Sequence, residues 1–206
     1  MPGQRAPEET RRDQILRAAY QIAAEQGIDG FTIRLVASTA GLSSGLVLFH
    51  YKSKERLLIA LLDWLLSSTL VPPTPSPVAA TRPAFELLLD LLWAEMRRLS
   101  AAPDRIRLLF EFWARGSRDP EVGQRMRQAL QSYREAFGVI GRAVLEAEPG
   151  RFEGVTPEGL ATMAVSVIKG CAVQAMIDPE GFEIVQYLVA ARSLVDDRGP
   201  RSQASS

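Results

Sequence analysis

The chain has 206 residues, of which 47% are hydrophobic and 23% are charged, and its 24 basic and 24 acidic side chains give a formal net charge of zero. This composition is typical of a folded protein with one large domain, or with a small domain joined to a larger one, and it excludes a partner chosen by overall charge alone. Cys171 is the only cysteine, so an intramolecular disulfide is excluded, and we expect a reducing, cytoplasmic location.

Neither a secretory signal nor a membrane span is expected. Met1–Arg12 is polar and contains proline, whereas a signal peptide needs an apolar core. The most apolar run, Leu57–Val71, is interrupted by Asp63 and Trp64 and is too short to cross a bilayer of about 30 Å comfortably. We therefore expect this run to form a buried helix and the protein to have no membrane partner.

The chain opens with a helical pattern. Apolar residues at helical spacing predict a helix from about Glu8 to Gln26, after a mobile arm over Met1–Pro7. Glycine takes positive φ without a steric clash, so Gly27 suits the position after a helix end. We expect Gly27–Gly30 to be a turn.

Three short helices are predicted next, each with a hydroxyl side chain at its start. Thr32, Ser43 and Ser53 can each accept a hydrogen bond from an amide of the following first turn. The last of these helices carries a wide leucine-rich face that other helices must cover. The predicted helices are Ile33–Ala40, Ser43 to His50 or Tyr51, and a third that starts at Ser53.

Prolines crowd the segment from Pro72 to Pro83, which makes it the clearest candidate for a domain boundary. Further helical patterns follow, and four of them open at or beside a proline, a residue tolerated in the first turn. They cover about Pro83–Ala101, Pro103–Gly116, Pro120–Glu148, Pro157–Ile177 and Gly181–Val195. With little β-type alternation anywhere, the fold class is predicted to be all-α, and Asp196–Ser206 is predicted to be disordered.

The stretch Phe31–Leu57 has the layout of a helix-turn-helix, in which one helix supports a second helix in the major groove of DNA. Ala37 lets the two helices approach closely, Gly41 makes the turn between them, and Val47 packs the second helix onto the first. The stretch holds four basic side chains and one acidic side chain. Such an excess attracts phosphates, although a solvated helix face has the same composition.

These residues resemble the tetracycline-repressor (TetR) family of bacterial transcriptional regulators. The family pattern after the turn is similar to Gly-Val-Ser-x-Gly-Thr-Leu-Tyr-Tyr-His-Phe-x-Ser-Lys-Glu-x-Leu. The corresponding residues here are Gly41-Leu42-Ser43-Ser44-Gly45-Leu46-Val47-Leu48-Phe49-His50-Tyr51-Lys52-Ser53-Lys54-Glu55-Arg56-Leu57. The chain departs from the pattern at Leu46 and Leu48, where the family often has Thr and Tyr. Leucine cannot bond a phosphate or a base edge, but it can contact a thymine methyl group.

The resemblance implies a recognition helix whose N-terminal residues approach base edges and whose neighbours hold phosphates. We expect Tyr51 to be a core residue and Phe49 to be exposed, while the resemblance points to phosphate contact for His50. Ser43 can equally be a plain helix cap. Lys54, at the start of the next helix, is the first choice for a phosphate contact, and a solvated surface charge is the alternative for both Arg34 and Lys54. The predicted DNA-binding residues are Thr32, Arg34, Ser43, Ser44, Gly45, Leu46, Leu48, Phe49, His50 and Lys54.

The helical remainder is predicted to hold a pocket for an apolar or amphipathic effector. Each candidate is a large side chain at helical spacing, a pattern that ordinary core residues share. The candidates are Trp64, Phe85, Trp93, Phe110, Trp113, Met126, Tyr133, Phe137 and Met163.

The segment Thr156–Ile177 is rich in small residues, which favour close helix packing, and it forms a predicted hairpin with the helix over Gly181–Val195. The resemblance implies that this hairpin pairs with its copy in a four-helix dimer interface, and an ordinary intrachain hairpin is the alternative. The predicted interface residues are Met163, Val167, Gly170, Gln174, Ile184, Tyr187 and Leu188.

The sequence therefore predicts a dimeric, sequence-specific repressor that a small effector releases from palindromic operator DNA. A DNA-binding activator or a regulator controlled by a partner protein is the alternative. An enzyme has little support, because no phosphate loop, dinucleotide fingerprint or zinc spacing is present, and no cofactor or metal is expected. Residues 1–56 are assigned to DNA binding with a flexible arm, 57–195 to effector binding and dimerisation, and 196–206 to a disordered tail.

Overall fold

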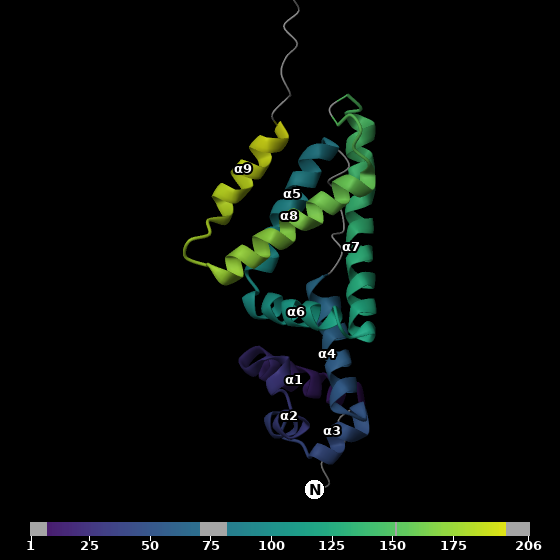
Figure 1. Ribbon diagram of the computed structural model, residues 1–206, viewed down its shortest axis with the longest axis vertical. Helices are drawn as coiled ribbons and strands as arrows, with labels where there is room; N and C mark the ends of the chain where they lie inside the picture. The colour runs from purple at the N-terminus through teal and green to yellow at the C-terminus, as the bar shows by residue number, and fades with distance from the viewer. Residues whose placement is uncertain (1–7, 71–81, 151, 197–206) are drawn as a thin grey trace, which may run out of the picture. The chain divides into compact units, whose positions relative to one another are not determined.

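The computed structural model describes residues 8–70, 82–150 and 152–196, and the regular structure in these ranges is entirely α-helical (Figure 1). The all-α prediction is confirmed. The predicted arm, most of the proline-rich segment and residues 197–206 of the predicted tail lie outside the described residues. The helices are α1 (Glu8–Gly30), α2 (Ile33–Thr39), α3 (Ser44–Tyr51), α4 (Lys54–Thr69), α5 (Ala84–Ser100), α6 (Pro103–Gly116), α7 (Pro120–Ala147), α8 (Pro157–Ile177) and α9 (Ile184–Asp196).

The helices gather into two compact units. The first unit lies within Met1–Val71 and Asp104–Ala129, so α1 to α4, α6 and the start of α7 belong to it. The second lies within Pro72–Pro103 and Leu130–Ser206 and contains α5, the rest of α7, α8 and α9. The functional division at residues 56 and 57 stays a prediction, because compactness and function need not share a boundary.

Local chemistry starts the short helices of the first unit. The side-chain oxygens of Thr32, Ser43 and Ser53 each accept a 3.2 Å hydrogen bond from the backbone amide three residues further along the chain. Each bond satisfies one of the amides that have no partner inside the helix. The three predicted caps are confirmed.

The first helix breaks at Gly27 as predicted, with φ 73° and ψ 170°, so the expected positive φ is present. The predicted turn is wrong only after that residue, because Ile28–Gly30 is helical and α1 resumes beyond the kink. One further turn follows because the Ile28 side chain is buried and its amide donates to a Glu111 carboxylate oxygen at 2.8 Å.

Helix α4 supplies much of the core of the first unit. Its leucine-rich face is buried as predicted, and α4 packs against α1 and α3. Burial of one such leucine side chain stabilises a fold by roughly 1.5–3 kcal/mol. The shared core therefore makes α1 to α4 one rigid support for the helix-turn-helix.

In the second unit, α8 packs along α5 and α9 covers both. Its core includes Tyr133, whose hydroxyl donates to the buried carboxylate of Glu95, and Arg98 donates to the same carboxylate at 2.6 Å. Burial and the hydrogen bond to Glu95 raise the pKa of Tyr133.

Helix α9 begins later than predicted. It starts at Ile184 and not at Gly181, because the Asp178 carboxylate accepts a 3.0 Å hydrogen bond from the Gly181 amide and holds a turn there. It ends at Asp196, so the first residue of the predicted tail is helical.

Helix α8 is long and apolar enough to cross a membrane by length and composition, with a mean hydropathy of 1.6 over an 18-residue window that is 39% buried. The core helix of a soluble protein can have the same length and hydropathy. Leu160 and Ile168 of α8 are buried in a unit where this helix packs along α5, as a core helix does.

Candidate nucleic-acid interface

The turn between α2 and α3 has the geometry that the sequence predicts. Ala37 and Val47 are 2% and 0% exposed, at the place where α2 meets α3. Gly41 holds φ at +64°, a conformation that a side chain disfavours, and the Leu42 amide closes the turn on the Ala37 carbonyl at 2.8 Å. The turn therefore fixes the angle at which α3 leaves α2.

Helix α3 has one buried side and one open side. Val47 and Tyr51 face the core, and the Tyr51 hydroxyl donates to the Arg12 carbonyl at 3.1 Å. Burial is the main cause that raises the pKa of Tyr51. Phe49 is 66% exposed and Leu48 is 40% exposed. The expected division, with Tyr51 in the core and Phe49 in solvent, is confirmed.

The start of α3 can receive an anion. The amides of Ser44 and Gly45 lie in the first turn, where no intrahelical acceptor exists, and the helix dipole adds partial positive charge. The Ser43 oxygen is taken by its cap bond to the Leu46 amide. A Cβ atom at Gly45 would meet only Ser43 Oγ, at 4.0 Å, among the residues that the structure describes, so there is open space beside this residue.

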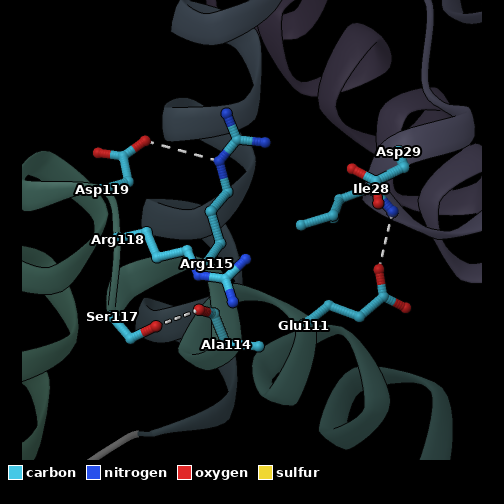
Figure 2. A pocket seen from close by; sticks show the side chains of 8 residues that line it. All are labelled: Ile28, Asp29, Glu111, Ala114, Arg115, Ser117, Arg118 and Asp119. Atoms are coloured by element: carbon cyan, nitrogen blue, oxygen red, sulfur yellow. Dashed lines mark hydrogen bonds and ion pairs between the residues drawn. The ribbon is translucent and has the colours of Figure 1, made fainter.

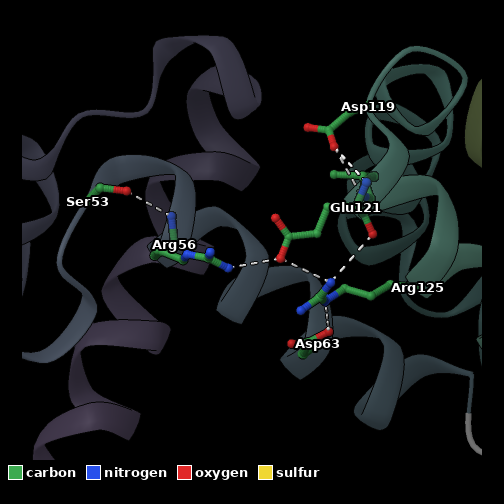
Figure 3. Close-up of polar contacts among 7 residues, drawn as sticks. Ser53, Arg56, Asp63, Asp119, Glu121 and Arg125 are labelled. Atoms are coloured by element: carbon green, nitrogen blue, oxygen red, sulfur yellow. Dashed lines mark hydrogen bonds and ion pairs between the residues drawn. The ribbon is translucent and has the colours of Figure 1, made fainter.

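The cations near the helix-turn-helix differ in how free they are. Arg34 is exposed on α2, beside the exposed cap residue Thr32, and Lys54 is partly exposed at the start of α4. Arg56 is instead committed to Glu121 of α7, with Nη1 and Oε1 3.0 Å apart (Figure 3). Of the four basic side chains in Phe31–Leu57, Arg56 is therefore neutralised by Glu121.

Figure 3 shows that this ion pair is part of a network. Glu121 Oε1 also lies 3.3 Å from Arg125 Nη1, and Arg125 Nε lies 2.9 Å from Asp63 Oδ1 of α4. Exposed pairs of this kind contribute little singly, at most about 1 kcal/mol, and more as a network. The network ties the start of α7 to α4.

His50 is partly exposed at the end of α3. Its Nδ1 atom is buried and has no hydrogen-bond partner among the described residues. The His50 ring lies edge-on to Phe49, with centroids 5.3 Å apart. Neither observation tests whether His50 contacts a phosphate, so that contact stays a prediction.

Sequence reasoning missed the side chains that hold the helix-turn-helix in place. Gln14 donates to the Ala40 carbonyl at 2.7 Å and closes the end of α2. Helix α6 holds the kink of α1 from both sides, because Arg107 donates to the Ala24 carbonyl at 3.1 Å and Glu111 accepts from Ile28 (Figure 2). No sequence signal marks these bonds, since the paired residues are far apart in the chain.

A cavity of about 710 Å³ lies beside this kink in the first unit (Figure 2). Its charged side chains are already engaged with one another in part. Arg115 and Asp119 are 3.5 Å apart, and hydrogen bonds from the Val122 and Glu121 amides lower the pKa of Asp119. A polar, partly ion-paired lining of this kind is typical of a solvent-filled surface depression.

The structure does not gather the nine predicted effector residues around one described cavity. Trp64, Phe110, Trp113 and Met126 belong to the first unit, and Phe85, Trp93, Tyr133, Phe137 and Met163 belong to the second. Some of them contact neighbours within their own unit. The Trp64 ring, for example, lies 5.4 Å from the Tyr20 ring and 4.9 Å from the Arg105 guanidinium.

Two of the nine, Trp93 and Met163, line a groove of about 550 Å³ between α5, α8 and α9, which we call the C-terminal groove. Its wall is mostly apolar and also includes Met96, Val167, Tyr187 and Leu188. Three of these, Val167, Tyr187 and Leu188, were assigned to the dimer interface. The predicted effector and interface residues therefore meet in this groove, and both roles stay predictions.

The remaining predicted interface residues lie on the same two helices. Gly170 lies beside Tyr187, whose hydroxyl donates to the Val167 carbonyl at 3.3 Å, while Gln174 is exposed and Ile184 is partly exposed. Three apolar side chains on α8 and α9 that are more than half exposed were not among the predicted interface residues. They are Ile177, Val185 and Val189, which are 72%, 53% and 55% exposed.

In the described part of the chain, no three His, Cys, Asp or Glu side chains are grouped so that they could hold a metal ion. The candidate site therefore consists of helix ends, hydroxyls, a few cations and an apolar outer face on α3. These groups can bind a polyanionic duplex, and they contain no nucleophile and base in hydrogen-bond reach.

Comparison with known proteins defines the class. A family model described as bacterial regulatory proteins, tetR family, matches residues 15–61, and one described as BetI-type transcriptional repressor, C-terminal, matches residues 86–199. The nicotine-responsive transcriptional repressor HdnoR of Paenarthrobacter nicotinovorans is 24% identical over 82% of this chain and 85% of its own length. The regulator BetI of Rhizobium meliloti is 30% identical over 56% of each chain.

Among solved structures, a transcriptional regulator from Saccharomonospora viridis in complex with choline superposes with a TM-score of 0.71. The match covers 92% of this chain and 97% of that one at 17% identity, which shows a shared fold. The protein is thus a helix-turn-helix transcriptional regulator and not an enzyme. The chain belongs to the TetR family of bacterial transcriptional regulators, and its C-terminal part is of the BetI repressor type.

Proposed function

We propose that the protein is a cytoplasmic, homodimeric repressor that binds a near-palindromic operator and leaves it when a small organic cation binds. The observation that carries the DNA-binding part is the geometry of α3, which is capped at its start, locked by Val47 and Tyr51 on one side and open on the other. In a two-fold dimer, two such helices about 34–36 Å apart enter successive major grooves. Residues 1–56 serve DNA binding, and 57–195 serve effector binding and dimerisation.

The assignment of contacts follows from position and chemistry. Thr32, Arg34 and Lys54 lie at helix starts next to α3 and hold phosphates, together with His50 at its end. Phosphate contacts set register and affinity without reading sequence.

At the first turn of α3, Ser43 keeps its cap role and can still donate its hydroxyl proton. Ser44 and Gly45 bring the first turn close to the DNA. Leu46, Leu48 and Phe49 face the groove floor.

The dimer is supported by the apolar side chains that α8 and α9 leave exposed. Met163 is 43% exposed, and Val185 and Val189 are more so. Neighbouring apolar surface on two packed helices is a common basis for a two-fold interface, in which one patch meets its own copy. Val167, Gly170, Gln174, Ile184, Tyr187 and Leu188 surround or extend this surface.

The effector class is supported by the C-terminal groove. Trp93 and Tyr187 contribute aromatic faces, and Met96 and Met163 contribute polarisable apolar surface. Aromatic rings attract organic cations by roughly 0.5–2 kcal/mol each. Two proteins similar to this chain are named for a nicotine response and for a choline complex; choline is a quaternary ammonium ion, and nicotine is an amine that is protonated near neutral pH.

Selection of duplexes from a random pool with the purified protein tests DNA binding. The expected product is one enriched, inverted-repeat motif, bound by two protomers in mass photometry, and a reporter placed behind the motif should be silenced by the protein. Absence of any enriched motif would overturn the DNA-binding proposal. Activation of the reporter would overturn the repressor part.

Calorimetry with choline and with its neutral isostere 3,3-dimethylbutan-1-ol tests the effector class. Choline should bind more tightly by about 2- to 30-fold for each aromatic ring that contacts it, and Trp93→Leu should reduce the preference by that factor. Arg97→Ala is the matched control, because Arg97 lies 6.0 Å from the Trp93 ring as a competing cation, so its loss should not weaken choline binding. Equal binding of the two compounds would exclude recognition of the charge.

A further inference from the structure

The side of α3 that faces away from the core is apolar. Val47 and Tyr51, one turn apart, fix the inward side. Gly45 and Phe49, also one turn apart, occupy the opposite side, and Leu48 lies beside Phe49. Phe49 and Leu48 are the most exposed large hydrophobic side chains on this helix, at 66% and 40%.

Hydrogen-bonding side chains are missing from the middle of this surface. The helix reads Ser-Gly-Leu-Val-Leu-Phe-His-Tyr and contains no Arg, Lys, Asn or Gln. Those four residue types make the bidentate contacts that distinguish guanine and adenine in the major groove. The polar side chains of α3 lie at its ends, with Ser44 in the first turn and His50 in the last.

The exposed Phe49 ring has two neighbours at the end of α3, Lys52 and His50. Lys52 Nζ lies 5.2 Å from the centroid of the Phe49 ring and also donates to the Phe49 carbonyl at 2.9 Å. The His50 ring meets it edge-on, at an interplanar angle of 84°. With both neighbours in place, Phe49 still presents most of its ring to solvent.

Among the four standard bases, thymine presents the largest carbon surface in the major groove. Thymine carries a C5-methyl group, whereas the other edges present donors and acceptors that carbon cannot satisfy. Burial of those donors and acceptors against Leu48 or Phe49 would cost free energy, while burial of a methyl group gains it.

We infer that Leu48 and Phe49 read thymine methyl groups, so that the operator has thymines where the middle of α3 enters each half-site. This inference rests on the proposed DNA binding and names the chemistry by which the same site selects sequence. Each methyl group buried against these side chains contributes about 4-fold to affinity. A symmetric pair of methyl groups, one in each half-site, contributes about 16-fold.

The test replaces thymidine by deoxyuridine in the selected operator, one symmetric pair of positions at a time. This change removes the methyl group and leaves base pairing intact. Fluorescence anisotropy should show about 16-fold weaker binding for at least one pair of positions under the middle of α3. Uridine in the flanking sequence should have no effect.

Variants assign the effect to side chains. In Leu48→Ala or Phe49→Ala the penalty for uridine should shrink at the position that the side chain covers, because the methyl partner has gone. Both side chains are exposed, so the folded chain tolerates their loss. Arg34→Ala is the matched control, since loss of a phosphate contact should weaken every duplex alike and leave the uridine penalty unchanged.

The outcomes separate this inference from the proposed function. An enriched operator whose affinity is indifferent to uridine at every position would overturn methyl readout and leave DNA binding intact. A uridine penalty that persists unchanged in both alanine variants would also overturn it. Absence of any enriched operator would remove both proposals together.

Discussion

The bond between Glu111 of α6 and the Ile28 amide gives a quantitative test of how the first unit is held together. The carboxylate oxygen lies 2.8 Å from the Ile28 nitrogen, directly after the kink at Gly27. Glu111→Ala removes the acceptor and leaves a partly buried amide without one. Hydrogen bonds to charged groups contribute about 1.5–3 kcal/mol, and because Glu111 is partly exposed we expect the lower end of this range.

For a chain of 206 residues, about 1.5 kcal/mol corresponds to a fall of roughly 3–6 °C in Tm. Glu111→Gln keeps an oxygen acceptor and loses the charge, so it should cost about half as much. Thermal unfolding followed by circular dichroism measures both values. Glu135→Ala is the matched control, because Glu135 is exposed on α7 and accepts a hydrogen bond from Gln131 on the same helix.

An unchanged Tm in the alanine variant would show that this hydrogen bond does not stabilise the first unit, and equal losses for alanine and glutamine would show that the charge of Glu111 contributes nothing. Gly27→Ala offers a second route to the same contact. A Cβ atom there would lie 3.2 Å from the Glu111 Oε2 atom, on a residue with φ +73°, so the variant should also lower Tm.

Three further predictions concern DNA binding, pH and assembly. Lys54→Ala should weaken binding to all duplexes alike and reduce the slope of log affinity against log salt by about one, and an unchanged slope would remove Lys54 from the phosphate contacts. Burial, with Arg134 nearby as a second cause, holds the pKa of Lys169 at about 8, below its usual 10.5. The unfolded chain then binds more protons between those values, so the Lys169 contribution to the free energy of unfolding rises with pH from about 8 to about 10.5. Urea unfolding of the wild type and Lys169→Met across this range should show that rise only in the wild type, and parallel curves would contradict it. Val189→Lys should convert the dimer to monomer in mass photometry without lowering Tm by more than a few degrees, whereas a persistent dimer would place the interface elsewhere.

The local structure of the helix-turn-helix follows from interactions between residues close together in the chain. The hydroxyls of Thr32, Ser43 and Ser53 bond amides three residues away, so the helix starts depend on nearest neighbours alone. The inward position of Val47 and Tyr51 follows from helical periodicity in the same way. Spacing of this kind, together with the family resemblance, was sufficient for the fold class and the recognition helix.

The tertiary structure alone decided which distant groups meet. Glu111 is 83 residues from Ile28, and Arg56 is 65 residues from Glu121, so neither contact leaves a periodic trace in the chain. The large side chains of the helical remainder show the same limit. Periodicity marked them as apolar and inward-facing, but their division between two units depends on which helix faces pack together, and that choice is made only when the whole chain folds.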